Sequence, residues 1–165
     1  MKCKIFFSSI IGVCLIIIYK LKLNIKRKNE INKELKWKNF KLEKSNRSLC
    51  YLYLLNKKDN NIKKYFDRQK IKTVAVYGMN EIGKAFVETL LDAGINICYG
   101  IDKNTNISFS AIEIRQVENI DDQTDMIIVT AEAYFEEISG LLKVKAPVRK
   151  LNELLEEILL VSYDY

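Results

Sequence analysis

Residues 72 to 83 read KTVAVYGMNEIG, and this stretch decides the fold. Its first six residues form a compact β-branched apolar run, short enough for a buried parallel strand. A turn that starts and ends with glycine follows, Gly78 to Gly83, and then Lys84 to Ala93 carry apolar residues at helical spacing. Gly94 provides a stop signal for that helix. Strand, glycine turn and helix in this order predict the opening unit of an α/β domain.

The turn itself is the first candidate ligand site. Backbone N–H groups at a helix start point outward, and the helix dipole adds about half a positive charge there. Gly78 permits the tight turn and Gly83 lets the helix approach the strand. Asn80 stands at the middle glycine of G-x-G-x-x-G, where its side chain either fills the path of a pyrophosphate or caps a structural turn. The candidate binding residues here are Gly78, Met79, Asn80, Glu81, Ile82 and Gly83.

Two further strand ends complete the candidate site. Ile95 to Ile101 predict a second strand, followed by Asp102 and Lys103 about 24 residues after the first glycine of the turn. Asp102 either accepts hydrogen bonds from ribose hydroxyls or shapes the Asp-Lys-Asn turn. Met126 to Thr130 predict a third buried strand, so Thr130 ends at the same sheet edge, where open α/β sheets bind ligands.

The remaining segments complete a small domain over residues 71 to 165. A helix from Glu132 to Leu142, a short strand from Pro147 to Leu151 and an acidic amphipathic helix from Asn152 to Val161 follow, and Ile112 to Ile114 give a possible edge strand. The predicted fold is a small doubly wound, mostly parallel, Rossmann-like α/β sheet.

Three stretches carry a family resemblance: VAVYGMNEIG at 74 to 83, YGIDKN at 99 to 104 and IIVTA at 127 to 131. They resemble small nucleotide-binding domains of bacterial surface-polysaccharide biosynthesis. The nearest kinds are the N-terminal domain of sugar acetyltransferases that bind UDP-sugars and the nucleotide-binding part of NDP-sugar epimerases and dehydratases. The resemblance implies a nucleotide, NAD or a nucleotide-sugar as ligand, and a polysaccharide-synthesis enzyme as partner.

The sequence departs from both relatives where they carry out catalysis. The chain contains no His, which removes the His that the acetyltransferases place in the glycine turn, the usual zinc ligand and the commonest general base. Tyr134 has Ile138 four residues later, so the predicted helix after the third strand has no Tyr-x-x-x-Lys pair of the kind that the epimerases use. Tyr99 and Lys103 have this spacing, but they lie in and just after the second predicted strand. Four cysteines show no Cys-x-x-Cys pairing. We therefore predict no catalytic set and no metal site.

Charge divides the chain into two halves. Residues 1 to 72 hold 20 Lys and Arg against 5 Asp and Glu, whereas residues 73 to 165 hold 7 against 16. The basic half begins with the uncharged run Ile5 to Tyr19, which extended to Leu23 approaches the length of a membrane-spanning helix. A single-pass anchor over residues 1 to 23 is expected, with the soluble part cytoplasmic by the positive-inside rule. A signal peptide and an interfacial or buried helix are the alternatives.

Residues 24 to 70 form a basic connector of predicted helices. Its lysines follow the anchor, so anionic membrane lipid is the expected partner. Trp37, Phe40 and Tyr51 among these lysines could stack on nucleic-acid bases, but we expect no nucleic-acid partner. Whether residues 46 to 70 belong to the α/β domain or form a separate docking element is open at this point.

Three functions fit this pattern. The first is a membrane-anchored nucleotide or NDP-sugar binding module, accessory to cell-surface polysaccharide biosynthesis. The second is an NAD-dependent epimerase or oxidoreductase relative, although its candidate residues, Tyr77, Tyr99, Asp102 and Lys103, lie on different loops. The third is a vestigial Rossmann scaffold that serves protein interaction.

Overall fold

The computed structural model describes residues 2–56, 61–120, 124–142 and 146–161. The chain forms two compact units, Met1–Phe40 and Lys41–Tyr165. Helix α1 (Lys2–Asn56) begins in the first unit and ends in the second. The second unit contains the sheet and every cavity discussed below.

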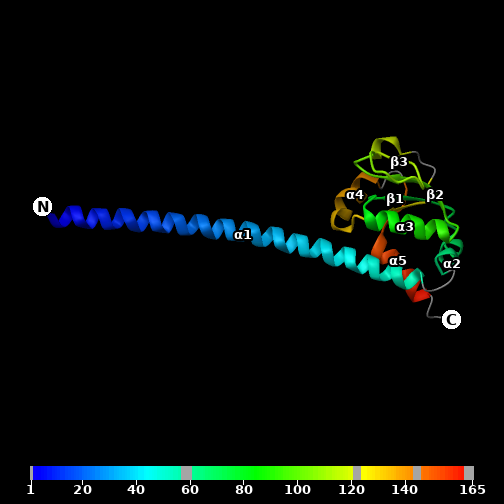
Figure 1. The fold of residues 1–165 in the computed structure, drawn as a ribbon, viewed down its shortest axis with the longest axis horizontal. Helices are drawn as coiled ribbons and strands as arrows, with labels where there is room; N and C mark the ends of the chain where they lie inside the picture. Colours follow the sequence, from blue (N-terminus) through cyan, green and yellow to red (C-terminus); the bar gives the residue numbers. More distant parts are fainter. Residues whose placement is uncertain (1, 57–60, 121–123, 143–145, 162–165) are drawn as a thin grey trace. The chain divides into compact units, whose positions relative to one another are not determined.

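The described residues of the second unit form a five-stranded sheet in the order β3-β2-β1-β4-β5, and all neighbouring strands are parallel (Figure 1). This is the doubly wound order, in which β2 and β3 lie on one side of the central strand β1, and β4 and β5 lie on the other. The predicted parallel Rossmann-like sheet is therefore confirmed. The edge strand predicted at 112 to 114 begins two residues later, at Ile114, and pairs with the end of β2. The strands are β1 (Thr73–Tyr77), β2 (Asn96–Ile101), β3 (Ile114–Arg115), β4 (Met126–Val129) and β5 (Val148–Lys150).

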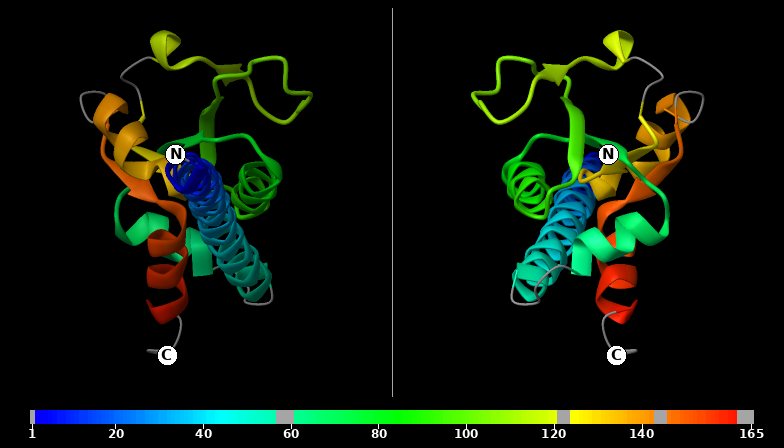
Figure 2. Two further views of the ribbon diagram at one scale, coloured as in Figure 1. Left: turned by 90° about the vertical axis from the view of Figure 1, so that its left-hand side faces the viewer. Right: turned by 90° about the vertical axis from the view of Figure 1, so that its right-hand side faces the viewer.

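Helices cover both faces of the sheet. Side chains alternate along β1, so Val74 and Val76 pack in the core shared with α3 and α5, whereas Ala75 and Tyr77 pack in the core shared with α4. Figure 2 shows α3 and α4 on opposite sides of the strands. The helices are α2 (Asn61–Arg68), α3 (Glu81–Asp92), α4 (Phe135–Leu142) and α5 (Leu151–Val161), with 3₁₀ turns at Val117–Asn119 and Glu132–Tyr134.

The end of α3 follows the predicted glycine signal. Gly94 adopts a positive φ of 72°, which glycine reaches without steric cost. Its N–H bonds to the Leu91 carbonyl at 2.9 Å, and the N–H of Ile95 bonds to the Leu90 carbonyl at 3.0 Å. These bonds satisfy carbonyls of the last turn and direct the chain into β2.

The end of α1 and all of α2 belong to the α/β core, which answers the question about residues 46 to 70. Their apolar side chains are buried with those of α3 and α5 and with one face of the sheet; these side chains are Leu52, Leu55, Ile62, Tyr65 and Phe66. The compact unit therefore includes two helical segments that precede β1.

A buried polar cluster fixes α1 against α5. The Ser48 hydroxyl donates to Asn152 Oδ1 at 2.9 Å. The Asn152 amide Nδ2 donates to Glu132 Oε2 at 2.8 Å and to the Lys44 carbonyl at 3.3 Å. The backbone N–H of Asn152 donates to the other Glu132 oxygen. Burial raises the pKa of Glu132 despite these hydrogen bonds. The cluster thus joins α1, α5 and the segment after β4.

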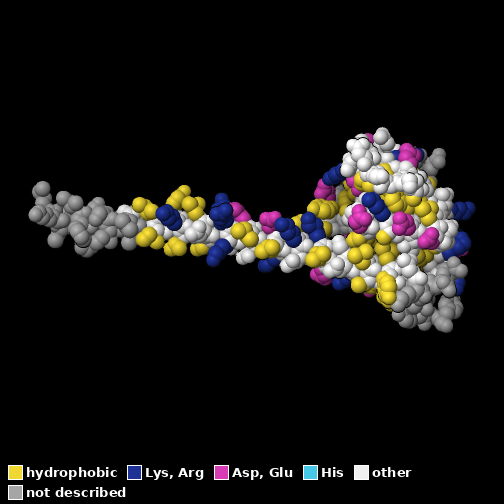
Figure 3. All heavy atoms as spheres, in the orientation of Figure 1, with side chains coloured by type: hydrophobic (Ala, Val, Ile, Leu, Met, Phe, Trp, Pro, Cys, Tyr) yellow, Lys and Arg dark blue, Asp and Glu magenta, His cyan; other side chains and the backbone are white. Residues whose placement is uncertain are grey.

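The first unit is helical, and from residue 15 on apolar and basic side chains are mixed along its surface (Figure 3). Trp37 and Phe40 stack with ring centroids 5.5 Å apart. Among the described residues, no helix provides a stretch both long and apolar enough to cross a membrane. The side chains of residues 2–11, 13 and 14, which make up much of the predicted anchor, lie outside the described part.

Candidate functional site

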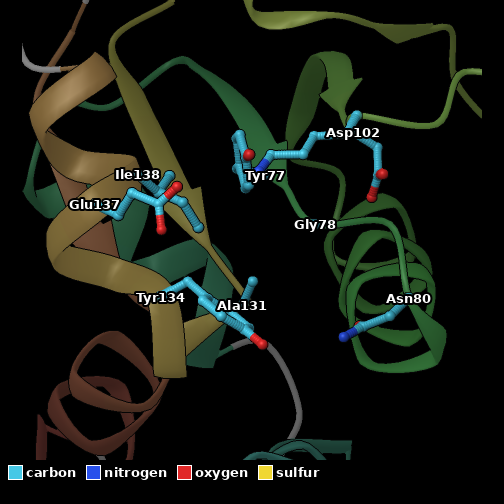
Figure 4. Close-up of a pocket in the computed structure, with 9 residues that line it drawn as sticks. Tyr77, Gly78, Asn80, Asp102, Ala131, Tyr134, Glu137 and Ile138 are labelled. Atoms are coloured by element: carbon cyan, nitrogen blue, oxygen red, sulfur yellow. The ribbon is translucent and has the colours of Figure 1, made fainter.

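A cavity of about 290 Å³ opens at the carboxyl ends of β1, β2 and β4 (Figure 4). It lies beside β1 and β4, where the winding of the sheet reverses and where open α/β sheets bind ligands. In the view of Figure 4, Tyr77 lies between Glu137 on one side and Asp102 on the other. The lining residues are Tyr77, Gly78, Asn80, Asp102, Lys103, Ala131, Tyr134, Glu137 and Ile138.

The Asn80 side chain caps α3. Its Oδ1 accepts hydrogen bonds from the N–H groups of Ile82 at 3.1 Å and Gly83 at 3.0 Å. The backbone of Asn80 is extended, with φ −73° and ψ −176°, as expected of an N-cap residue. Of the two roles that the sequence allowed for Asn80, the structure adopts the cap. Two amides that would face a phosphate are therefore already bonded within the chain.

Asp102 bonds to the same turn from the neighbouring strand. Its Oδ2 accepts from the N–H of Met79 at 2.8 Å, and its Oδ1 accepts from the N–H of Asn104 at 3.0 Å. The second bond is the turn-forming role that the sequence allowed. Because each carboxylate oxygen has two lone pairs, Asp102 can also accept a ligand hydroxyl from within the cavity that it lines.

Neither end of the glycine turn has room for a side chain. A Cβ at residue 83 would lie 2.0 Å from the Gly78 carbonyl oxygen, and a Cβ at residue 78 would lie 2.7 Å from Thr130 Oγ1. Gly78 also has a positive φ of 94°. The Thr130 hydroxyl lies 2.6 Å from the Gly78 carbonyl oxygen and holds the turn against the end of β4. The predicted roles of Gly78 and Gly83 agree with this packing.

The predicted site residues fall into two groups. Gly78, Asn80, Asp102 and Lys103 line the main cavity. The other side chains do not reach it. Those of Met79 and Ile82 are buried in the core, that of Glu81 is exposed beside Lys84, and Thr130 is buried at the sheet edge, where it lines a smaller cavity described below.

Sequence reasoning missed the wall that α4 supplies. Tyr134 and Glu137 lie three residues apart, on the 3₁₀ turn and the first turn of the helix after β4, and both line the cavity. Such a spacing places them on one face of the segment. The position of this segment at the carboxyl edge of the sheet was the available signal.

The electrostatic environment of the cavity is acidic. Burial raises the pKa of Tyr77, and the nearby carboxylates of Asp102, Glu137 and Glu118 raise it further. The Tyr77 phenol therefore stays protonated at neutral pH and acts as a hydrogen-bond donor or acceptor. Two carboxylates, from Asp102 and Glu137, line the cavity against the single ammonium group of Lys103. This lining favours hydroxyl and amino groups of a ligand over phosphate.

The strand order and the cavity at its reversal define the second unit as a Rossmann-like, doubly wound α/β domain. No protein-family model and no curated protein matches the chain. Within the described ranges, no three His, Cys, Asp or Glu side chains gather as a metal site.

Two solved structures show a distant likeness to this chain. One is the NADPH-dependent glyoxylate/hydroxypyruvate reductase of Sinorhizobium meliloti in apo form, at 13% identity and a TM-score of 0.35, over 52% of this chain and 40% of the reductase. The other is RSP, a Rex-family repressor, at 16% identity and a TM-score of 0.43, over 64% of each chain. The chain thus spans less than two thirds of the length of either protein.

Proposed function

We propose that this protein binds a nucleotide, with the nucleoside part in the main cavity. The observation that carries the proposal is the convergence of Tyr77, Asp102 and Glu137 at the reversal point of the sheet. Ribose hydroxyls are donors that suit the two carboxylates, and the Tyr77 ring offers apolar contact area. The volume of about 290 Å³ lies at the lower end of small-molecule sites and suits a nucleoside-sized group.

The fuller proposal is a membrane-anchored NDP-sugar module, accessory to surface-polysaccharide biosynthesis. Its support is the resemblance of the stretches at 74–83, 99–104 and 127–131, together with the uncharged run at 5–19 and the lysines that follow it. In this arrangement the α/β unit is cytoplasmic and presents its ligand to a separate enzyme.

The raised pKa of Tyr77 fits a binding role better than acid–base catalysis. A catalytic acid or base works best when its pKa lies near the operating pH. The pKa of Tyr77 is raised, further away from neutral pH, because burial and three carboxylates favour the neutral phenol. The epimerase alternative therefore lacks support from Tyr77.

Glu137→Gln is expected to weaken nucleotide binding about tenfold, because a charged acceptor for a ligand hydroxyl becomes neutral. The neighbouring Glu136→Gln is the matched control, since Glu136 is exposed and faces Lys150 at 3.9 Å. The measurement is thermal shift of the full-length protein in mild detergent with NAD, NADP, UDP-sugars, GDP-sugars and free nucleotides. A ligand at 100 times its dissociation constant adds about 2.7 kcal/mol, or several degrees in Tm. Equal loss in both variants would contradict this site.

The scaffold alternative has one observation in its favour, namely that Asn80 and Asp102 already occupy amides of the glycine turn. A turn that satisfies its own donors is stable without a phosphate. If the purified protein binds no nucleotide of the panel and associates tightly with itself, the result would support this alternative over the nucleotide module.

Asn80→Gly is expected to tighten binding of a nucleoside diphosphate several-fold, with a smaller effect on binding of the nucleoside alone. The substitution frees the amides of Ile82 and Gly83 for phosphate, and Gly at an N-cap costs only a few tenths of a kcal/mol in stability. Calorimetric titration with ADP and adenosine, and with UDP and uridine, measures the effect. Asn80→Ala, which frees the same amides at a stability cost of about 1 kcal/mol, should show the same gain. Unchanged affinity in both variants would mean that the turn does not face the phosphate.

A further inference from the structure

A second, smaller cavity adjoins the main one on the side of α1. Its volume is about 100 Å³, and it shares Asn80, Ala131 and Tyr134 with the main cavity. Its far wall is the segment of α1 from Lys41 to Ser45. The lining residues are Lys41, Lys44, Ser45, Asn80, Thr130, Ala131, Glu132, Ala133 and Tyr134.

The two cavities differ in the sign of their charge. Two lysines line the small cavity against the one carboxylate of Glu132, whereas two carboxylates line the main cavity against one lysine. The Glu132 carboxylate accepts hydrogen bonds from the backbone and side-chain N–H groups of Asn152, and the charge of Lys44 also acts on it. A ligand that extends across both cavities would therefore place hydroxyl groups in the main cavity and an anionic group in the small one.

The lysines of the small cavity are held in position by the packing of α1. Lys41, Lys44 and Ser45 share one face of the helix, because residues three and four apart are neighbours. Ser48 continues this face and is fixed by its hydrogen bond to Asn152 at 2.9 Å. Both lysines are half-buried and line the cavity.

We propose that Lys41 and Lys44, with the Ser45 hydroxyl, bind the phosphate group of the nucleotide, and that the end of α1 is thus part of the binding site. This inference rests on the proposed function. It also explains how a phosphate could bind although Asn80 and Asp102 occupy the amides of the glycine turn. Charge-assisted hydrogen bonds from lysine replace those of the helix start.

The test compares Lys41→Gln/Lys44→Gln with Lys33→Gln/Lys36→Gln, which removes the same charge from exposed positions of the same helix. The probes for calorimetric titration of the full-length protein are inorganic pyrophosphate, the nucleosides adenosine and uridine, and their diphosphates. We expect the first double variant to bind pyrophosphate and diphosphates about tenfold to a hundredfold more weakly, with nucleoside binding unchanged. The control double variant should bind all probes like the wild type, and circular dichroism checks that each variant folds.

Each component of the proposal fails in its own way. Wild-type protein that binds nucleosides and diphosphates equally well, with no effect of Lys41→Gln/Lys44→Gln, overturns this inference and leaves the nucleoside site standing. Pyrophosphate binding that depends on these lysines, without any nucleoside binding, supports the anion site and overturns the proposed function. Equal loss of binding to phosphatidylglycerol vesicles in both double variants, with diphosphate affinity unchanged, assigns the lysines to a lipid surface and overturns the inference.

Discussion

Gly83→Ala is expected to lower the free energy of unfolding by more than about 4 kcal/mol, enough to unfold much of the protein. The added Cβ would lie 2.0 Å from the Gly78 carbonyl oxygen and 3.0 Å from its carbon. Both are backbone atoms held between β1 and α3, so no rotation of a side chain relieves the contact. Urea denaturation followed by circular dichroism measures the loss.

Gly140→Ala is the matched control, because Gly140 also lies in a helix but has nothing within 4 Å of an added Cβ. This variant should gain about 0.5–1 kcal/mol from the lower entropy of the unfolded chain. A midpoint for Gly83→Ala close to the wild-type value would mean that α3 does not approach β1 as closely as described. Substitutions at residue 83 also change the fold itself, so they are unsuited to a test of phosphate binding.

Asn152→Ala is expected to cost about 3 kcal/mol of stability. The change removes the acceptor of the buried Ser48 hydroxyl and the amide donor to the half-buried Glu132 carboxylate. Chemical denaturation quantifies the loss. The adjacent Glu153→Ala removes an exposed ion pair with Lys150 and should cost less than about 1 kcal/mol.

A double-mutant cycle with Ser48→Ala tests whether the two residues act together. A coupling energy of about 1 kcal/mol or more between positions 48 and 152 is expected for groups that share a buried hydrogen bond. Strictly additive losses would show that Asn152 stabilises α5 alone and does not fix α1.

The core of the fold was predictable because its signals are local. The β-branched run at 72–77, the two glycines of the turn and the stop at Gly94 each restrict a few neighbouring residues. Parallel pairing and the shared carboxyl edge then follow from the alternation of strands and helices. Gly78, Asn80, Asp102 and Lys103 were placed at the cavity by this reasoning.

The rest of the site depends on contacts between distant segments. Whether Asn80 caps α3 or leaves its amides open is decided by a side-chain rotamer that no spacing encodes. Lys41 and Lys44 reach the sheet edge only because Leu52 and Leu55 are buried beside α5, and the sequence showed these lysines merely as part of a basic connector. Glu137 was missed for the same reason, since its role depends on the direction of α4.

The contact between Ser48 and Asn152 joins residues that are 104 positions apart in the chain. During synthesis, α1 can form as soon as it leaves the ribosome, because helices need only local contacts. Its apolar residues Leu52 and Leu55 have no α5 to cover them until more than a hundred further residues are translated. The nascent chain therefore exposes these apolar side chains for several seconds, at an elongation rate of about 5–20 residues per second. Exposed apolar surface of this kind is what chaperones bind and what promotes aggregation.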